Sequence, residues 1–179
     1  MKTKLITVFC IFLVVLFLGS LSAQSYETGP DPVADIQVVV LSKEFGWQGK
    51  IRIIGIVKNI GADYISKPHQ QAAYLYVTDP TGKTVTNIIG QLDFTTLKAG
   101  QEIRLTYDTA WDTGREFAPC FKLVIQYDPD INKDGNSNND DRDTANNVKT
   151  LCEAEINKQY RDQLPLLIKI QPIVVEIIK

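Results

Sequence analysis

The chain has few of the side chains on which most enzyme sites depend. Its 179 residues include one histidine and three cysteines. His69 follows Pro68 in a polar connection and is expected at the surface, and there is no Gly-x-Ser-x-Gly nucleophile motif. A Ser–His–acid triad would have to use this histidine, and the cysteines cannot bind zinc without further ligands. We therefore expect no catalytic residues and no enzyme activity.

The sequence also lacks a basic stripe. Its formal net charge is −2, and residues 128–143 alone hold six Asp against Lys133 and Arg142. Recognition of nucleic acid depends on clustered Lys and Arg, so we do not expect a nucleic-acid partner. The acidity belongs to one segment, which either holds a cation or stays solvated.

The first residues have the pattern of an export signal. Lys2 and Lys4 precede an apolar run over residues 5–18, and the small residues that follow predict cleavage near Ala23. A retained membrane anchor is the alternative, but the run is shorter than the roughly 20 residues that a spanning helix needs. The sequence thus predicts a secreted, periplasmic or cell-surface protein with no transmembrane anchor after cleavage of residues 1–23.

Cleavage would leave two cysteines, Cys120 and Cys152. An even pair in an exported protein predicts a disulfide, since such compartments are oxidising. Two separately buried thiols are the alternative.

The rest of the chain reads as strands separated by turns. Residues 24–33 form a flexible lead-in, and Gly61 is expected in a turn with positive φ. Strands are predicted over residues 35–41, 50–59, 71–78, 83–89, 102–108, 117–127 and 146–151, with an irregular stretch at 92–97. About seven short strands predict an all-β fold: an antiparallel, immunoglobulin- or fibronectin-III-like β-sandwich over residues 34–152. Residues 153–179 form an extension, with a short helix over 153–163 and an apolar edge or irregular strand over 164–178.

The two cysteines predict where the last hairpin turns. If Cys120 and Cys152 face each other across an antiparallel pair, the residue numbers of all partners sum to 272, which centres the hairpin on Asn136. The acidic segment is then the tip of this hairpin.

The same segment has the spacing of a twelve-residue calcium loop. Its oxygen-bearing side chains stand at positions 1, 3, 5, 7, 9 and 12, with Gly135 at position 6. The predicted ligands are Asp130, Asn132, Asp134, Asn136, Asn138 and Asp141. Ca²⁺ is the expected ion, because Mg²⁺ tolerates flexible protein loops poorly. A long, solvated Asn/Asp-rich turn is the alternative.

Several short stretches resemble a known family. They are Asn59-Ile60-Gly61 after a long strand, residues 97–102 (LKAGQE) before an alternating one, and Tyr127-Asp128-Pro129-Asp130 followed by Asn146-Asn147. Their order and spacing resemble the CARDB (cell-adhesion-related) domain over residues 34–151. The inner twelve residues of the acidic segment resemble the calcium loop of dockerin modules. The resemblance implies an immunoglobulin-like, non-catalytic adhesion module.

We therefore expect an exported, non-enzymatic module that binds a protein or polysaccharide and has a calcium-ordered hairpin loop. The alternative is a structural subunit whose apolar tail, residues 166–178, pairs with the sheet edge of another chain. Five aromatic residues either form a platform for carbohydrate or fill the core and cover its edges: Trp47, Trp111, Tyr64, Tyr74 and Tyr76.

Overall fold

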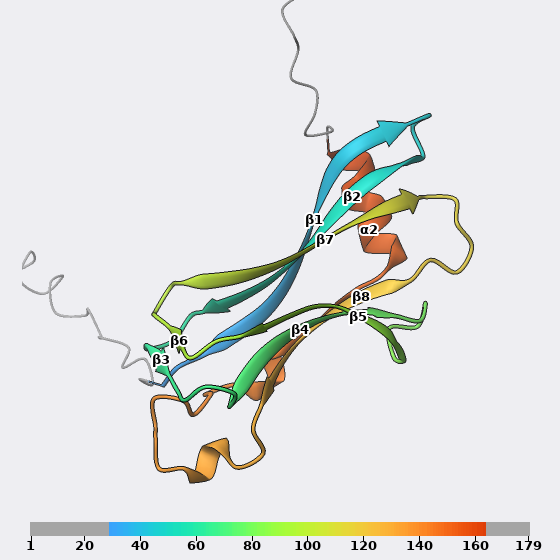
Figure 1. Ribbon diagram of the computed structural model, residues 1–179. Helices are drawn as coiled ribbons and strands as arrows, with labels where there is room; N and C mark the ends of the chain where they lie inside the picture. Colours follow the sequence, from blue (N-terminus) through green and yellow to red (C-terminus); the bar gives the residue numbers. More distant parts are fainter. Residues whose placement is uncertain (1–28, 164–179) are drawn as a thin grey trace, which may run out of the picture.

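A computed structural model describes residues 29–163, in which two larger antiparallel sheets pack face to face (Figure 1). The predicted signal segment, most of the lead-in and the apolar tail lie outside the described residues. One sheet has the order β1-β2-β7, formed by β1 (Pro32–Glu44), β2 (Gln48–Asn59) and β7 (Glu102–Asp112). The other has the order β5-β4-β8-β9, formed by β4 (Gln71–Thr78), β5 (Val85–Asp93), β8 (Cys120–Tyr127) and β9 (Val148–Leu151). The predicted antiparallel β-sandwich is confirmed.

The core follows from the alternation of apolar side chains along these strands. On β1 every second residue from Ala34 to Val40 is buried, and on β4 and β8 the buried residues include Leu75 and Leu123, both 0% exposed. Because successive side chains of a strand point to opposite faces, each sheet offers one apolar face to the other. The two faces together form a single hydrophobic cluster.

Between β5 and β7 the structure differs from the strands predicted from the sequence. Residues 92–97, predicted to be irregular, complete β5 and then form β6 (Thr96–Leu97), which pairs with β3 (Tyr64–Ile65). Gly61 does not have the predicted positive φ. A glycine is needed here because the backbone of Gly29 passes close to it, and a Cβ on residue 61 would lie 2.3 Å from the carbonyl oxygen of Gly29.

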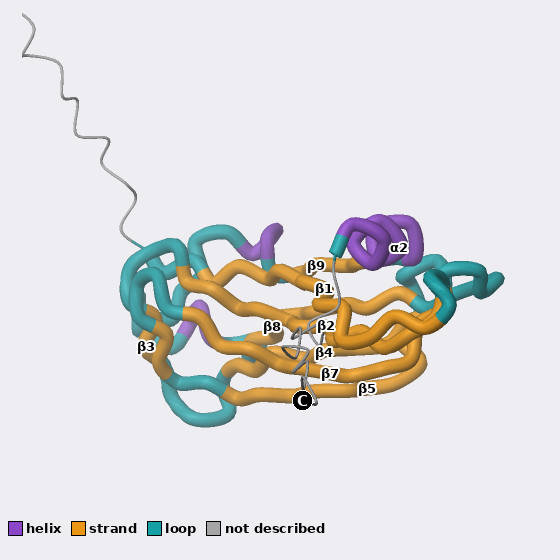
Figure 2. Tube along the Cα trace, turned by 90° about the horizontal axis from the view of Figure 1, so that it is seen from above, coloured by secondary structure: helices purple, strands orange, loops and turns teal. Residues whose placement is uncertain are grey.

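Helix α2 (Glu153–Asp162) covers the free edge of β1 (Figure 2). The Gln159 side chain accepts the backbone N–H of Val38, and the Gln163 side chain accepts that of Val40 and donates to the Val38 carbonyl. These amides occupy the backbone groups that an exposed edge strand would offer to another chain. The middle of the β1 edge is thereby protected.

Asn59, at the end of β2, joins three segments around the end of the sandwich that carries the acidic loop. Its side chain is 0% exposed. The carbonyl oxygen accepts the backbone N–H groups of Asp31 and Gly61, and the amide donates to the carbonyls of Ala62 (2.5 Å) and Leu97 (2.7 Å). This one side chain therefore ties the start of β1 to the turn after β2 and to β6.

We predict that Asn59→Ala lowers the free energy of unfolding by about 2–4 kcal/mol, because it leaves several buried backbone groups without partners. Equilibrium unfolding in urea measures this loss. The matched control is Asn87→Ala at an exposed position of β5, which should change the value by less than about 0.5 kcal/mol. Equal effects of the two variants would contradict the prediction.

Candidate functional site

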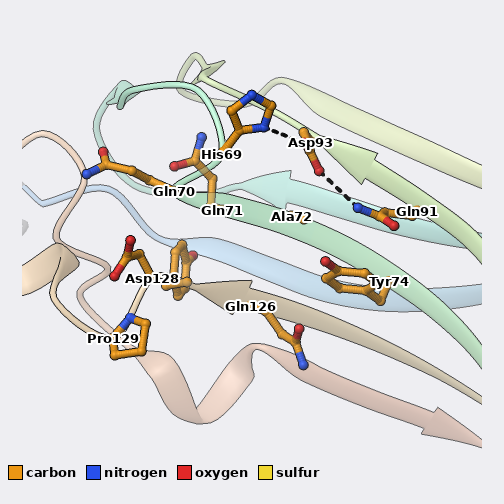
Figure 3. A pocket seen from close by; sticks show the side chains of 11 residues that line it. His69, Gln70, Gln71, Ala72, Tyr74, Gln91, Asp93, Gln126, Asp128 and Pro129 are labelled. Carbon is orange, nitrogen blue, oxygen red and sulfur yellow. Dashed lines mark hydrogen bonds and ion pairs between the residues drawn. The ribbon is translucent and has the colours of Figure 1, made fainter.

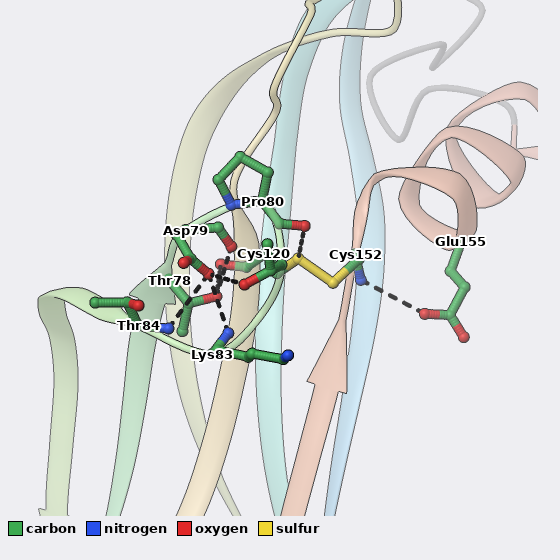
Figure 4. The surroundings of a disulfide bond; sticks show 9 residues. Thr78, Asp79, Pro80, Lys83, Thr84, Cys120, Cys152 and Glu155 are labelled. Atoms are coloured by element: carbon green, nitrogen blue, oxygen red, sulfur yellow. Dashed lines mark hydrogen bonds between the residues drawn. A yellow bond between two sulfur atoms is a disulfide. The ribbon is translucent and has the colours of Figure 1, made fainter.

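Strands β8 and β9 form the predicted hairpin, and the disulfide closes it. The pairs Phe121 with Leu151 and Val124 with Val148 each sum to 272, as expected from the cysteine positions. Cys120 and Cys152 are bonded, with their Cα atoms 4.2 Å apart (Figure 4). The predicted disulfide is confirmed, and it fixes both arms of the hairpin that carries the acidic loop.

The turn between β4 and β5 packs beside this disulfide (Figure 4). Asp79 accepts hydrogen bonds from the Thr81 hydroxyl and from the backbone of Lys83 and Thr84. These bonds lower the pKa of the Asp79 carboxyl to about 2. These bonds order the turn, in which Gly82 lies close to both sulfur atoms of the bridge.

Between β8 and β9 the chain forms the acidic loop, which we define as residues 128–147. It contains two short 3₁₀ helices, η1 (Ile131–Lys133) and η2 (Thr144–Asn146), and lies at the same end of the sandwich as β3 and β6 (Figure 1). Ile131 is 4% exposed and anchors the first helix, and Gly135 has the positive φ (76°) that its position in the calcium pattern requires. The loop is therefore packed, in spite of its polar composition.

On one side, the acidic loop is hydrogen-bonded to β3 and to the segment that connects β3 with β4. The Ile65 backbone donates to the Asn138 carbonyl and accepts from the Asn136 side chain. Gln70 donates to the Asp134 carboxylate, and Asn139 donates to the Ser66 hydroxyl.

On the other side, the acidic loop is attached through the chain before β1. Arg142 pairs with the almost fully buried carboxylate of Asp31, and Asn146 donates to the same carboxylate at 2.7 Å. The loop is thus fixed to both neighbouring segments.

The structure separates the six ligands predicted from the calcium spacing. Asp130 is exposed and pairs with Lys133, while Asp134 accepts from the Asn136 backbone and from two side-chain amides. Asn136 and Asn138 are engaged with Ile65. Asn132 and Asp141 line one cavity of ≈ 360 Å³. Within residues 29–163 no three His, Cys, Asp or Glu side chains form a group that could hold a metal ion.

The acidic loop instead buries oxygen atoms that have no hydrogen-bond partner. These atoms are Oδ1 of Asn139, Asp140, Asn146 and Asn147. A buried oxygen without a partner costs about 1–3 kcal/mol of folding free energy. Folded proteins contain few such atoms, so their concentration in this one loop suggests a missing ligand.

The orientation of the three asparagines is determined by the carboxylates beside them. Asn139 donates its amide to Asp134, Asn146 to Asp31 and Asn147 to Asp141. Exchanging nitrogen and oxygen in any of these amides would place two acceptors together. The carbonyl oxygens therefore point away from the carboxylates, toward positions where no donor of the described chain meets them.

Two of these asparagines, Asn139 and Asn147, line the same cavity as Asp141. One Asp141 oxygen accepts from the Tyr127 hydroxyl (3.0 Å) and from Asn147 (2.6 Å), and the other accepts from the backbone of Asp143. Burial raises the pKa of the Asp141 carboxyl in spite of these bonds, and burial also raises the pKa of Tyr127. A positive charge in the cavity would offset the desolvation of this carboxylate.

The donor set of this cavity fits a hard cation. Carboxylate and amide oxygens are the ligands that Ca²⁺ prefers, and no sulfur or imidazole is among the lining residues. Of the oxygen-bearing residues that line this cavity, the calcium spacing includes Asn132 and Asp141 but not Asn139 and Asn147. The paired Asn146-Asn147 before the last strand was the available signal, since both residues now carry an unpartnered oxygen.

The single histidine is at the surface, as predicted. His69 is 86% exposed at the side chain, and its Nδ1 lies 3.3 Å from the carboxylate of Asp93. The described residues contain no helix of the length and hydropathy that crossing a membrane requires.

Comparisons with known proteins concern the fold. No family model and no curated protein matches the chain. Among solved structures, the CARDB domain of a Pyrococcus furiosus protein, in complex with di-metal ions, is similar at 18% identity and a TM-score of 0.41, over 71% of this chain and 94% of that chain. The β-glucosidase 3B of Thermotoga neapolitana, solved with glucose and with glycerol, is similar at 14% identity and a TM-score of 0.26, over 55% of this chain and 14% of that chain.

The first of these matches agrees with the CARDB resemblance carried by the sequence. The dockerin-like part of the resemblance stays a prediction.

We predict that Cys120→Ala together with Cys152→Ala lowers the free energy of unfolding by about 3–4 kcal/mol, the chain-entropy value for a sequence separation of 32 residues. Urea unfolding measures the loss. Dithiothreitol should destabilise the wild-type protein by a similar amount and leave the double variant unchanged. A change below about 1 kcal/mol would show that the hairpin does not depend on the bridge.

Proposed function

We propose that the chain is an exported, non-enzymatic binding module whose acidic loop is ordered by one Ca²⁺ ion. The observation that carries the proposal is the set of buried, unpartnered oxygens in the loop between β8 and β9. Export is supported by the disulfide, since such bonds persist in oxidising compartments. The partner is a protein or polysaccharide at the cell surface.

The ion would be held by residues of the loop cavity, with Asn139, Asp141 and Asn147 as its central ligands and Asn132 at its rim. Bound Ca²⁺ supplies a positive charge and takes 6–8 oxygen ligands, so backbone carbonyls and water would complete the set. The Asn147 amide holds the Asp141 carboxylate while its own oxygen stays available. The hairpin of β8 and β9 would then be stiffened at both ends, by the ion in its loop and by the disulfide at its base.

The twelve-residue spacing offers a second arrangement, in which Asp130, Asp134 and Asn136 rearrange around the ion together with Asp141. It requires the loop to give up the hydrogen bonds of Asp134 to Asn139 and Gln70 and of Asn136 to Ile65. The cavity arrangement keeps these bonds. Variants at Asp130 and Asn147 separate the two.

We predict that Ca²⁺ raises the thermal midpoint of the exported protein, by several degrees at 100 times the dissociation constant, because the ion binds only the folded loop. Asp141→Asn keeps the shape of the cavity and should abolish the shift, and Asn147→Ala should weaken binding at least tenfold by calorimetric titration. Asp130→Asn is the matched control and should bind normally. Loss of binding in Asp130→Asn with full binding in Asn147→Ala would favour the twelve-residue pattern, and no shift in the wild-type protein would overturn the calcium proposal.

The raised pKa of Asp141 predicts a pH dependence of the cation-free protein. Because the folded-state pKa lies above the unfolded value, the contribution of this group to stability is full below the unfolded pKa and is lost as pH rises through the folded pKa. The midpoint of the wild-type protein minus that of Asp141→Asn should therefore fall, in EDTA, as pH rises above the usual range of an aspartate carboxyl, about pH 4. Saturating Ca²⁺ should reverse this trend. A difference that is independent of pH would contradict the account.

A further inference from the structure

We infer that the outer face of the four-stranded sheet binds a neutral polysaccharide, in a groove that runs across β5, β4 and β8 beside the acidic loop. The inference rests on the proposed function, a binding module, and names the chemical class of its partner. The groove has a volume of ≈ 380 Å³ and is lined by residues of these strands, of the segment before β4 and of the segment after β8 (Figure 3).

The strand register brings outward-facing side chains of β5, β4 and β8 together. On β4 the side chains of Ala73 and Leu75 are 0% exposed and point into the core, so those of Tyr74 and Tyr76 point outward. Tyr74 lies opposite Gln91 on β5, and the next row toward the acidic loop places Asp93 and Gln126 on either side of Ala72. Ala72 has no bulk above the sheet, so this row forms the floor of the groove.

An aromatic side chain stands at one side of this floor. Tyr74 lines the groove, and Tyr76 stacks on it with ring centroids 5.8 Å apart and an interplanar angle of 12°. Tyr76 is not among the lining residues and therefore supports the ring of Tyr74. A fixed aromatic ring provides an apolar face with a polar hydroxyl at its edge, which suits the C–H face and hydroxyl rim of a sugar ring.

The remaining lining is polar and partly preorganised. Asp93 accepts from Gln91 at 3.3 Å and lies 3.3 Å from the His69 ring, as the dashed lines in Figure 3 show. Gln126 is exposed and lines the groove from β8, and its side chain makes no hydrogen bond within the described residues. Amides and carboxylates placed side by side can both donate to and accept from hydroxyl groups. A ligand rich in hydroxyl groups can accept hydrogen bonds from the amides and donate hydrogen bonds to the carboxylates.

The charge of the groove determines which polysaccharides fit. Asp93 and Asp128 are among its lining residues, and no Lys or Arg is. Chains bearing sulfate, phosphate or uronate would meet like charge at both carboxylates, so the structure favours an uncharged chain. A protein partner is disfavoured because the centres of protein interfaces are depleted in charged residues.

The acidic loop forms one wall of the groove through Asp128 and Pro129. The same loop holds the segment before β4, since Asp134 accepts from Gln70, another lining residue. Ordering of the loop by an ion would thus also fix the shape of the groove, which couples the two sites.

The test is affinity electrophoresis of the exported protein in gels that contain hydroxyethyl cellulose, arabinoxylan or galactomannan, with alginate as the anionic comparison. We expect retardation by at least one neutral polysaccharide and none by alginate. Tyr74→Ala and Gln126→Ala should each raise the apparent dissociation constant at least tenfold. Gln126 is exposed, so this variant should keep the wild-type midpoint. Trp47→Ala, which removes an exposed aromatic residue in the turn between β1 and β2, is the matched control and should bind normally.

Three outcomes would overturn the inference: no retardation by any neutral chain, retardation by alginate alone, or equal binding by Gln126→Ala and the wild type. The calcium-induced rise in the midpoint is measured on the same variants and should persist in Tyr74→Ala and Gln126→Ala. Its persistence without polysaccharide binding would refute the groove alone, and its absence in the wild-type protein would refute the ion alone.

Discussion

The antiparallel pairing of β8 with β9 is the constraint on which the functional end of the molecule depends. β9 has four residues and is an edge strand, so its hydrogen bonds alone would hold it weakly. The disulfide at the far end of the hairpin fixes the register of β9 against β8. With this register the acidic loop lies at the same end of the sandwich as β3 and β6. A slip of one residue would turn the buried Leu151 outward and break the contacts of Asn146 and Asn147.

Within this frame, the acidic loop combines two features that are costly unless a ligand is present. Asn139, Asn146 and Asn147 are held by carboxylates in the one orientation that leaves their carbonyl oxygens unpartnered, and the partly buried carboxylate of Asp141 is desolvated. A plain solvated turn would place these groups in water. Ca²⁺ in the cavity would give the amide oxygens a partner and would offset the desolvation of the carboxylate. We therefore prefer a loop ordered by an ion to a solvated turn without one.

The fold and the hairpin could be predicted from the sequence because they depend on patterns that the chain repeats. Alternating apolar residues identify the strands, and two cysteines determine the centre of the last hairpin. The two-residue strands β3 and β6 could not be found, since so short a pair has no periodicity and exists through its contact with Asn59 and its neighbours. The predicted calcium ligands of the acidic loop depend on spacing alone. Spacing could not show that Asp134 and Asn136 are drawn toward Gln70 and Ile65, nor that Asn139 and Asn147 are buried.

The central claim is that one Ca²⁺ ion sits in the cavity beside Asp141. The most direct measurement is a crystal structure of the exported protein grown with Ca²⁺, with anomalous differences recorded at long wavelength. The account predicts one peak at about 2.3–2.6 Å from oxygens of Asn139, Asp141 and Asn147. A peak coordinated by Asp130 and Asp134 instead, or no peak in a loop with the same hydrogen bonds, would contradict it.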